Sequence, residues 1–565
     1  MWKGHENSSV LRLPKVCGAD VELGNFILGG DDLWVTERDA SRALLRQIRG
    51  LPMSSLSADY RFGLTLPCPS TRFEHGGCRR FHSTAGGGNG GGSSYFNPQD
   101  WGRRFLPGSG GCAYEDSCHT ELCLPETLDS WSHLAYWNGL LRIARRALFG
   151  ANRIQPAGRR IQVLVNNSDG RGNSYGSHLN FLITRRAWDH MFLKKVHHLL
   201  FLAAYQVSSI VFTGQGKVGS ENGAPPCAFQ LSQRADFFET LMGAQTMTNR
   251  PIVNSRDESL CGRGPSGASE CARLHVIFYD STLAHVASLL KVGVMQIILS
   301  MIEAECVNPD LLLDDPVDAV TRYSHDPALR ARAATVSGRG LSALELQFLF
   351  LEEASRFVAR GGCEGIVPRA DEIMLLWEDT LHKLERRDLE ALSRRLDWVL
   401  KLQIIARAMA QQPGLGWNSP QIKVLDHLYS SLDDSEGLYW AYEKSGFVER
   451  VVSEEQIESS VENPPEDTRA WTRAMLLRTA KPEEVEDVDW NSMTFNIRGQ
   501  SYWPTQRTLY LPHPLGHTKA AAESCFQNAG SLEEILDALE SLDQECRTGG
   551  NDETGPRSEP ALITH

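Results

Sequence analysis

The segment CAYEDSCHTELCL, residues 112–124, carries polar side chains at two-residue spacing, at Tyr114 and Asp116 and again at His119 and Glu121. Successive side chains of a strand point to opposite faces, so Tyr114 and Asp116 would share one face. If extended structure resumes after a short break, Glu121 would lie on the polar face of the next stretch, with apolar side chains opposite. The pattern predicts a sheet with one polar face and one apolar face.

A second acidic segment, GADVELG at 18–24, has the same two-residue spacing. Asp20 and Glu22 would lie on one face of a strand, between glycines that leave space beside them. Paired carboxylates repel each other unless a positive group lies between them, and oxygen ligands suit Mg²⁺. We therefore expect the two acidic strands to share a magnesium site. Either segment alone would also fit an exposed strand edge with solvated charges.

The cysteines of the first segment raise two other interpretations, a zinc site and a disulfide. The spacing C-x5-C-x4-C with one histidine does not match the usual structural zinc sites, and none of the 13 cysteines forms a C-x-x-C pair. The N-terminus has no apolar leader that would indicate secretion. We expect most of the cysteines to be small buried packing residues.

Composition excludes some classes of function. The net charge of −13 gives no electrostatic footprint for nucleic acid, which we therefore do not expect as a partner. No run approaches the roughly 18 apolar residues that a membrane span needs, and the most apolar stretch, 290–302, predicts a buried helix. We expect a cytoplasmic enzyme without a membrane partner.

The order of the predicted elements indicates an α+β protein. Strands are expected at 16–28, 160–166 and 179–184, and helices at 37–49 and 128–149, within a mixed sheet domain that reaches about residue 300. Apolar residues at three- and four-residue spacing predict packing helices at 341–360, 369–383 and 387–411. Between 51 and 108 a long Gly/Ser-rich segment predicts a loop that is either functional or disordered.

Few segments of the chain suggest an anion site. A magnesium ion held by few carboxylates normally keeps a phosphate partner. Arg234 lies among apolar residues in FQLSQRADFFE, where a phosphate would satisfy its charge. The glycine-rich FTGQGKVG at 212–219 is not a P-loop and is only a weak signal, and His275 in RLHVIFYD could be an ordinary core histidine.

These segments, in this order, resemble one known family. The run YEDSCHTELCLPE is similar to the Y-x-D-x-x-H-x-E-x-x-x-P-E motif of the Pup ligases and Pup deamidases/depupylases, the enzymes of prokaryotic ubiquitin-like protein modification. The resemblance is collinear over about residues 16–500. Its further motifs are NNSDGRGNSYGSHLNFL, FTGQGKVG, FQLSQRADFFE, RPIVNSRDE, ARLHVIFYD, GLYW, VENPPEDTRAWTR and DWNSMTFNI.

The resemblance implies a glutamine synthetase-like fold, in which a curved antiparallel sheet backed by helices forms a cradle for Mg²⁺-ATP and a small C-terminal domain closes beside it. The implied organisation is an N-terminal extension at 1–15, a catalytic domain at 16–440 that is mainly helical at 300–411, a C-terminal domain at 441–545 and a disordered tail at 546–565.

The resemblance also implies roles for individual residues. Asp116 matches the catalytic aspartate. The expected magnesium contacts are Asp20, Glu22 and Glu121. The expected nucleotide contacts are Tyr114, His178, Arg234, His275, Arg469, Arg473 and Trp490, with Arg234 as the phosphate contact.

Two positions depart from the family pattern. The first acidic residue of the family's G-x-E-x-E is Glu, but here it is Asp20, which is one methylene shorter. The family's H-E-N is here His178-Leu179-Asn180, which loses a carboxylate. We expect both changes to lie at or near the metal cradle, where they would alter metal occupancy or lower activity.

Secondary features favour a hydrolase, because the long 51–108 segment is similar to an extra loop of the deamidase/depupylase. ATP and Mg²⁺ would be bound cofactors, and Asp116 would act either as a nucleophile or as a base. The alternatives are a ligase that consumes ATP and a degenerate homologue that binds without turnover. The expected partners are Pup or a Pup-like modifier and its conjugates, with a functional link to a proteasome, for a chain that acts as a monomer.

Overall fold

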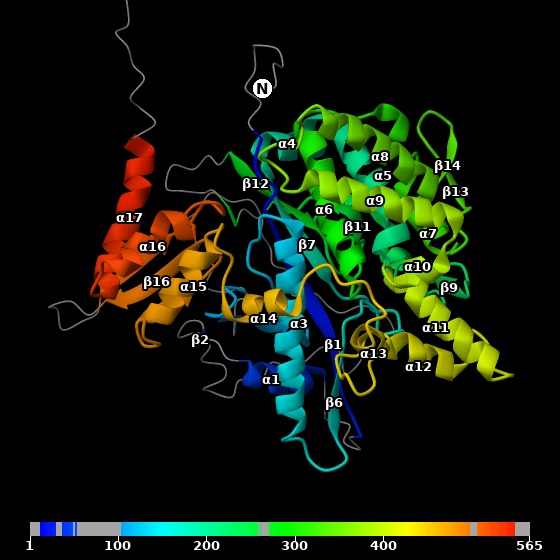
Figure 1. Ribbon diagram of the computed structural model, residues 1–565, viewed down its shortest axis with the longest axis horizontal. Coiled ribbons are helices and arrows are strands. Elements are labelled where there is room, and N and C mark those ends of the chain that lie inside the picture. The colour runs from blue at the N-terminus through cyan, green and yellow to red at the C-terminus, as the bar shows by residue number, and fades with distance from the viewer. Residues whose placement is uncertain are drawn as a thin grey trace, which may run out of the picture.

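The computed structural model describes residues 12–29, 37–48, 51–52, 103–257, 260–261, 270–497 and 505–548. Most of the predicted Gly/Ser-rich loop and the end of the predicted tail lie outside these residues, as do the first eleven residues of the predicted N-terminal extension. The described chain is an α+β protein with one large sheet at its centre (Figure 1).

The central sheet has eight strands and is antiparallel throughout. Its order is β12-β7-β1-β5-β4-β3-β2, with β6 paired to the far end of β1. Its strands are β1 (Cys17–Leu28), β2 (Leu51–Pro52), β3 (Arg104–Phe105), β4 (Cys112–Asp116), β5 (His119–Cys123), β6 (Arg160–Leu164), β7 (Ser177–Thr184) and β12 (Cys271–Val276).

The two faces of β1 differ in polarity, as the alternation of the sequence predicts. Ala19 and Val21 are buried in the main hydrophobic core, whereas Asp20 and Glu22 between them lie on the polar face. A shift of one residue in register would exchange the faces, so burial of the apolar side chains fixes which strand positions face the polar side.

Helices cover the apolar face and continue into a large helical region. α1 packs on β1, β4 and β5 and also contacts α3, while α6 packs against β7, α3 and α5. The helices from α5 to α9 gather on one side of the sheet in Figure 1. The α-helices are α1 (Glu37–Gln47), α3 (Ser130–Asn152), α4 (Arg185–Asp189), α5 (Val196–Thr213), α6 (His285–Glu303), α7 (Pro316–Ser324), α8 (Ala343–Ala359), α9 (Ala370–Arg386), α10 (Leu389–Ser393), α11 (Asp397–Gln411), α12 (Pro420–Leu428), α13 (Leu438–Lys444), α14 (Glu454–Glu462), α15 (Ala470–Thr479), α16 (Lys519–Gln527) and α17 (Leu532–Thr548).

Two of these helices are long and apolar enough to cross a membrane by composition alone. The most apolar windows of α5 and α6 are 83% and 100% buried inside the protein. The stretch at 290–302, predicted to be a buried helix, lies within α6, so that prediction is confirmed. Both helices are core helices of the described structure.

The shorter strands form four small sheets. β8 pairs with β9, β10 with β11 and β13 with β14, while β15, β16 and β17 form a three-stranded sheet. Their bounds are β8 (Lys217–Val218), β9 (Phe229–Gln230), β10 (Thr240–Gly243), β11 (Pro251–Asn254), β13 (Arg332–Ala334), β14 (Gly340–Ser342), β15 (Val485–Val488), β16 (Ser492–Ile497) and β17 (Thr505–Tyr510).

The C-terminal elements share a second core with the edge of the central sheet. β15–β17 and the helices α15–α17 lie on the side of the molecule opposite the helical region (Figure 1). Phe105 of β3 and Tyr114 of β4 belong to the same hydrophobic cluster as Trp471 and Phe495. The predicted division of the chain, with a C-terminal domain at 441–545, stays a prediction.

Two expectations about local structure need correction. The segment 387–411 is two helices, α10 and α11, because Asp397 begins a new helix and its buried carboxylate accepts hydrogen bonds from the N–H groups of Leu283 and Ala284.

The break between β4 and β5 is a two-residue turn in which Ser117 and Cys118 both have positive φ. Cys118 is disulfide-bonded, unlike the free packing cysteines expected there.

A buried ion pair ties the start of the described chain to α6. The Lys15 ammonium lies 2.5 Å from the carboxylate of Glu303, and both side chains are fully buried. The same carboxylate accepts hydrogen bonds from the N–H groups of Leu13 and Thr184. Glu303 therefore joins three segments that are distant in sequence.

Glu303→Gln would leave the Lys15 ammonium buried without its counter-charge. Because breaking a buried pair on one side costs roughly 3–5 kcal/mol, we expect the midpoint of thermal unfolding to fall by several degrees. The matched control is Glu305→Gln, which removes a half-exposed carboxylate paired with Arg186 and Lys195 and should change the midpoint little. Equal midpoints for the two variants would contradict this prediction.

Candidate active site

The polar face of the sheet brings the two acidic segments together. β1 pairs directly with β5, so that Glu22 lies opposite Glu121, and Glu121 in turn lies opposite Tyr114 of β4. On the other side of β1, Asp20 lies opposite His178 of β7. Side chains at opposed positions of an antiparallel pair share a face. Residues more than 150 positions apart therefore meet on one surface.

Three carboxylates form an oxygen-only group on this face. The side chains of Glu22, Asp116 and Glu121 each offer an oxygen, and these oxygens lie within 4.8 Å of one another. Burial raises the pKa of Glu121 well above its usual range, and the nearby charges of Asp20, Asp116 and Glu22 raise it further. Tyr114 donates a hydrogen bond to Glu121. A group of hard oxygen donors that repel one another fits a divalent cation such as Mg²⁺.

A second group combines a carboxylate with two imidazoles. Nδ1 of His178 lies 2.6 Å from Oδ2 of Asp20, and Asn180 donates a hydrogen bond of 2.9 Å to the other oxygen. Burial raises the pKa of Asp20, but His178 outweighs this effect and the net pKa is lowered. The ring of His275 lies 5.1 Å from that of His178. Ligand atoms of Asp20, His178 and His275 lie within 4.8 Å of one another.

His275 is the member of this group with an unsatisfied nitrogen. Its Nδ1 is buried and has no hydrogen-bond partner among the described residues. Burial lowers the pKa of His275 well below its usual range, and Arg273 lowers it further, so the imidazole is neutral at neutral pH. A buried neutral nitrogen without a partner is available to a ligand, which argues against an ordinary core histidine.

A glycine and a tyrosine close one end of the polar face. A Cβ at Gly176 would lie 2.6 Å from the His178 ring and 2.7 Å from a Glu22 oxygen, so a larger residue here would displace these side chains. The ring of Tyr175 lies 4.5 Å from that of His119. His119 contacts Oε2 of Glu22 through Nδ1 at 3.2 Å. The loop before β7 thus packs directly on the acidic residues.

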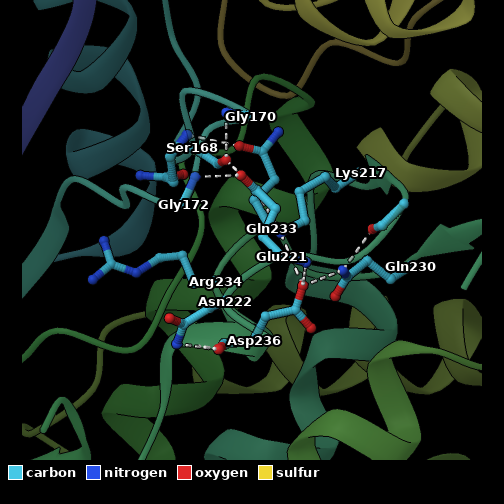
Figure 2. Close-up of polar contacts among 12 residues, drawn as sticks. Ser168, Gly170, Gly172, Lys217, Glu221, Asn222, Gln230, Gln233, Arg234 and Asp236 are labelled. Carbon is cyan, nitrogen blue, oxygen red and sulfur yellow. Dashed lines mark hydrogen bonds and ion pairs between the residues drawn. The ribbon is translucent and has the colours of Figure 1, made fainter. Parts of the chain in front are cut away.

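Arg234, predicted to contact a phosphate, is almost completely buried. Its guanidinium donates to the carbonyl of Tyr175 at 2.7 Å, while its Nε has no hydrogen-bond partner among the described residues. Burial and the neighbouring Arg250 lower its pKa to about 9, while Asp280, Glu22 and Asp20 act in the opposite direction. Figure 2 shows the side chain extending away from the polar network around Asp236.

The three C-terminal residues predicted to contact nucleotide lie around Glu126. Arg469 Nε contacts one Glu126 oxygen at 2.8 Å and Arg473 Nη2 the other at 2.7 Å, and both arginines are buried. The guanidinium carbon of Arg473 lies over the ring of Trp490, 4.8 Å from the ring centroid. Most of the remaining N–H groups of the two arginines donate to backbone carbonyls. This clamp joins the central sheet to the C-terminal unit, and nucleotide contact by these residues stays a prediction.

The two departures from the family pattern differ in their structural consequence. Leu179 is 2% exposed and lies in the hydrophobic core, because neighbouring positions of β7 point to opposite faces. The expectation that position 179 lies at the metal cradle is therefore wrong. Asp20 does lie on the polar face, where His178 and Asn180 bind both of its oxygens.

Several residues to which the sequence assigned no role contribute to the site. His119 contacts Glu22, Asn180 contacts Asp20, and Arg250 donates to the carbonyl of Ser174 at 3.1 Å. Glu126 connects the two C-terminal arginines. Alternation within β5 and β7 places His119 and Asn180 on the polar face, but pairing of Glu126 with the arginines depends on contacts across more than 340 residues.

Comparisons with known proteins identify relatives of this chain. A family model described as Pup-ligase protein matches residues 79–494. The Pup deamidase/depupylase of Mycolicibacterium smegmatis is 33% identical over 433 residues, which are 76% of this chain and 82% of that protein. The Pup–protein ligase of Acidimicrobium ferrooxidans is 35% identical over 422 residues, which are 73% of this chain and 88% of that protein.

Solved structures have the same fold. The complex between the prokaryotic ubiquitin-like protein Pup and its ligase PafA matches with a TM-score of 0.70 at 21% identity, covering 97% of this chain and 99% of that chain. The Pup ligase PafA in complex with ADP matches with a TM-score of 0.63 at 24% identity, covering 78% of this chain and 90% of that chain. The expected cradle-like α+β fold is confirmed.

Glu126→Gln would leave two buried guanidinium groups without their counter-charge. The two arginines outweigh the effect of burial and lower the pKa of Glu126 to about 2 from 4.5. We expect a loss of roughly 3–5 kcal/mol of unfolding free energy. This loss should be constant above about pH 4.5 and shrink as the pH falls toward 2, since protonation of Glu126 removes the same interaction in the unsubstituted protein.

Thermal unfolding of the two proteins between pH 3 and 8 measures this difference. The matched control is Glu466→Gln, which removes a carboxylate that is 67% exposed and paired with Lys519. A variant of Glu126 that unfolds at the same temperature as the Glu466 variant would rule out a stabilising clamp.

Proposed function

The chain belongs to the Pup-ligase family, and from the geometry of its polar sheet face we propose that it is an ATP-dependent amidase of Pup modification. The proposed reaction removes ammonia from the C-terminal glutamine of a Pup-like modifier, cleaves the isopeptide bond between modifier and substrate lysine, or does both. The observation that carries the proposal is the position of Asp116 beside Glu22 and Glu121, at the end of β4.

The proposed cofactors are ATP and Mg²⁺. Glu22 and Glu121 would hold the ion, and Asp20, in the neighbouring group with His178 and His275, would be a further metal contact. Arg234 would contact a phosphate. When bound, Mg²⁺-ATP would supply positive charge and hydrogen-bonding groups that stabilise the oxyanion of an amide under attack. Tyr114, His178 and His275 are proposed to complete the nucleotide and metal contacts.

Asp116 is the proposed catalytic residue. Its carboxylate lies at the strand end, where Ser117 donates a hydrogen bond to Oδ1 at 3.1 Å and the next two residues turn the chain away. From this position it can attack the carbonyl carbon to form an acyl intermediate, or it can take a proton from an attacking water. In either case the amine leaves, as ammonia in deamidation or as a lysine amine in deconjugation.

A ligase that forms the isopeptide bond is the second candidate, favoured by the 35% identity to the ligase of Acidimicrobium ferrooxidans. Glu22, Asp116 and Glu121 would then serve transfer of the γ-phosphate and attack by lysine. A homologue without turnover has less support, because Leu179 lies in the core and so removes no ligand from the polar face. The chain is further proposed to act as a cytoplasmic monomer with a functional link to a proteasome.

Asp116→Asn removes both proposed roles of the carboxylate. We expect the release of target protein from a Pup conjugate in the presence of ATP to fall by roughly 10²-fold or more. The matched control is Glu115→Gln on the opposite face of β4, whose carboxylate pairs with Arg38 and Arg42. Full activity of the Asp116 variant would refute the assigned site.

The same assay separates the candidates. A hydrolase releases free target without stoichiometric ADP, whereas a ligase makes conjugate from modifier, target and ATP with one ADP for each bond. Absence of both reactions under conditions in which the protein is folded would refute both enzymatic proposals.

Glu121→Gln is expected to weaken Mg²⁺ binding by roughly tenfold or more, because it removes a charged oxygen ligand. Since the pKa of Glu121 is raised, a proton competes with the ion. Apparent affinity should therefore rise with pH through that raised pKa, and binding should release a proton. Calorimetric titration with Mg²⁺ in buffers of different ionisation enthalpy measures both effects. Glu115→Gln should bind as the unsubstituted protein does, and pH-independent binding would contradict the prediction.

A further inference from the structure

A chain of hydrogen bonds crosses the polar face of the sheet and begins at Arg273 on β12. Arg273 lies two positions before His275 and shares its face, while Leu274 between them is buried in the main core. Nη1 of Arg273 donates to Oδ1 of Asn180 on β7 at 2.8 Å. Nδ2 of Asn180 donates to Oδ1 of Asp20 on β1 at 2.9 Å. Two direct hydrogen bonds therefore join three neighbouring strands (Figure 1).

The two partners of Asn180 fix the orientation of its amide. An asparagine amide can turn by half a rotation, which exchanges the places of its oxygen and its nitrogen. A guanidinium only donates hydrogen bonds, and a carboxylate only accepts them. Between Arg273 and Asp20, the amide oxygen must therefore face the arginine and the amide nitrogen must face the carboxylate. Without the guanidinium, the turned amide would place its oxygen against the oxygen of Asp20.

Asp20 in turn orients His178. Asn180 binds Oδ1 of Asp20, and Oδ2 lies 2.6 Å from Nδ1 of His178. A carboxylate that is bound at both oxygens cannot rotate without breaking one of the two contacts. With Nδ1 of His178 on Asp20, the other ring nitrogen, Nε2, borders the space beside Gly176, as Oε1 of Glu22 also does. The chain of contacts therefore leads from β12 to the oxygen-only group.

The environment of the chain strengthens these contacts. The side chains of Arg273, Asn180 and Asp20 are all partly buried, so water screens them less than it screens a surface pair. Both ends of the chain are ionic groups, and hydrogen bonds to such groups are about twice as strong as those between neutral groups. Loss of Arg273 should therefore be felt at Asp20.

We propose that Arg273 is a positioning residue of the candidate active site, which acts through Asn180 to hold Asp20 in place. The inference rests on the proposed function, because it assigns Arg273 to the support of the proposed metal and nucleotide contacts Asp20 and His178. In this role Arg273 acts through its neighbours and not on the substrate.

The side-chain amide of Asn180 reports on these hydrogen bonds directly. In protein labelled with ¹⁵N-asparagine, the pair of amide proton signals that is missing from Asn180→Ala belongs to residue 180. The proton donated to a carboxylate should resonate downfield of the amide protons of exposed asparagines. Arg273→Met removes the donor to the amide oxygen, so this proton should shift upfield toward the position of exposed asparagines. Arg273→Lys keeps a group that only donates and should retain most of the downfield shift.

The proposed reaction supplies a second readout. Residues that orient metal ligands typically contribute roughly 10–100-fold to activity. We expect Arg273→Met to lower kcat for release of target from a Pup conjugate about tenfold with little change in KM, and Arg273→Lys to recover most of that loss. Because the effect passes through Asn180, the double variant Arg273→Met/Asn180→Ala should be no slower than Asn180→Ala alone.

The matched control is Arg185→Met, which removes an arginine that directly follows β7 and pairs with Asp257 at 2.8 Å. It should leave both kcat and the Asn180 signals unchanged. Unchanged Asn180 signals in Arg273→Met, or losses that add in the double variant, would overturn the proposal.

The unsubstituted protein keeps the test valid even where the Arg273 variants fold poorly. Absence of a downfield amide proton at Asn180 would overturn the proposal without any variant of Arg273. If the unsubstituted protein shows neither reaction, the proposed function fails, and the amide signals still decide whether Arg273 holds Asn180 in place.

Discussion

Repulsion among four carboxylates on one face of a sheet is the constraint around which the rest of the structure is arranged. Asp20, Glu22, Asp116 and Glu121 reach this face from three adjacent strands. Like charges at this separation disfavour one another's ionised forms, and burial strengthens the effect. Burial raises the pKa of Glu121 most, and the charges of Asp20, Asp116 and Glu22 raise it further. A divalent cation would offset these like charges, so the polar face is suited to one.

The surrounding residues each relieve part of that repulsion. His178 contacts Asp20, His119 contacts Glu22, and Tyr114 donates to Glu121, so each of these three carboxylates has a hydrogen-bonding neighbour on the same face. The positive charge of Arg234 also helps to lower the pKa of Glu22. Apolar residues on the opposite face, such as Ala19 and Val21, fix the register that brings the polar groups together. Stability and site geometry are therefore coupled through the same strands.

Much of this arrangement was predictable because strand alternation is local. The spacing of Tyr114, Asp116 and Glu121 assigns each to a face without knowledge of the fold. The matching acidic spacing also predicted that segments 18–24 and 112–124 would meet, as β1 and β5 do. Other contacts between distant segments were not predictable, because no local pattern records which strands pair. The Glu126 clamp is one example. The prediction that Leu179 lies at the metal cradle was wrong for a different reason. The comparison of motifs overlooked the strand alternation that places this residue in the core.

The same alternation explains why a shorter acid is compatible with position 20. β1 divides the polar face into an oxygen-only group on the side of β4 and β5 and a mixed group on the side of β7 and β12. Glu22 belongs to the first group and Asp20 to the second, where His178 and Asn180 bind its two oxygens. Asp20 therefore orients the imidazole of His178 on the neighbouring strand. The short side chain is long enough for this role, since its Oδ2 lies 2.6 Å from Nδ1 of His178. The loss of one methylene then falls on the group with the two imidazoles and leaves the oxygen-only group of Glu22, Asp116 and Glu121 unchanged.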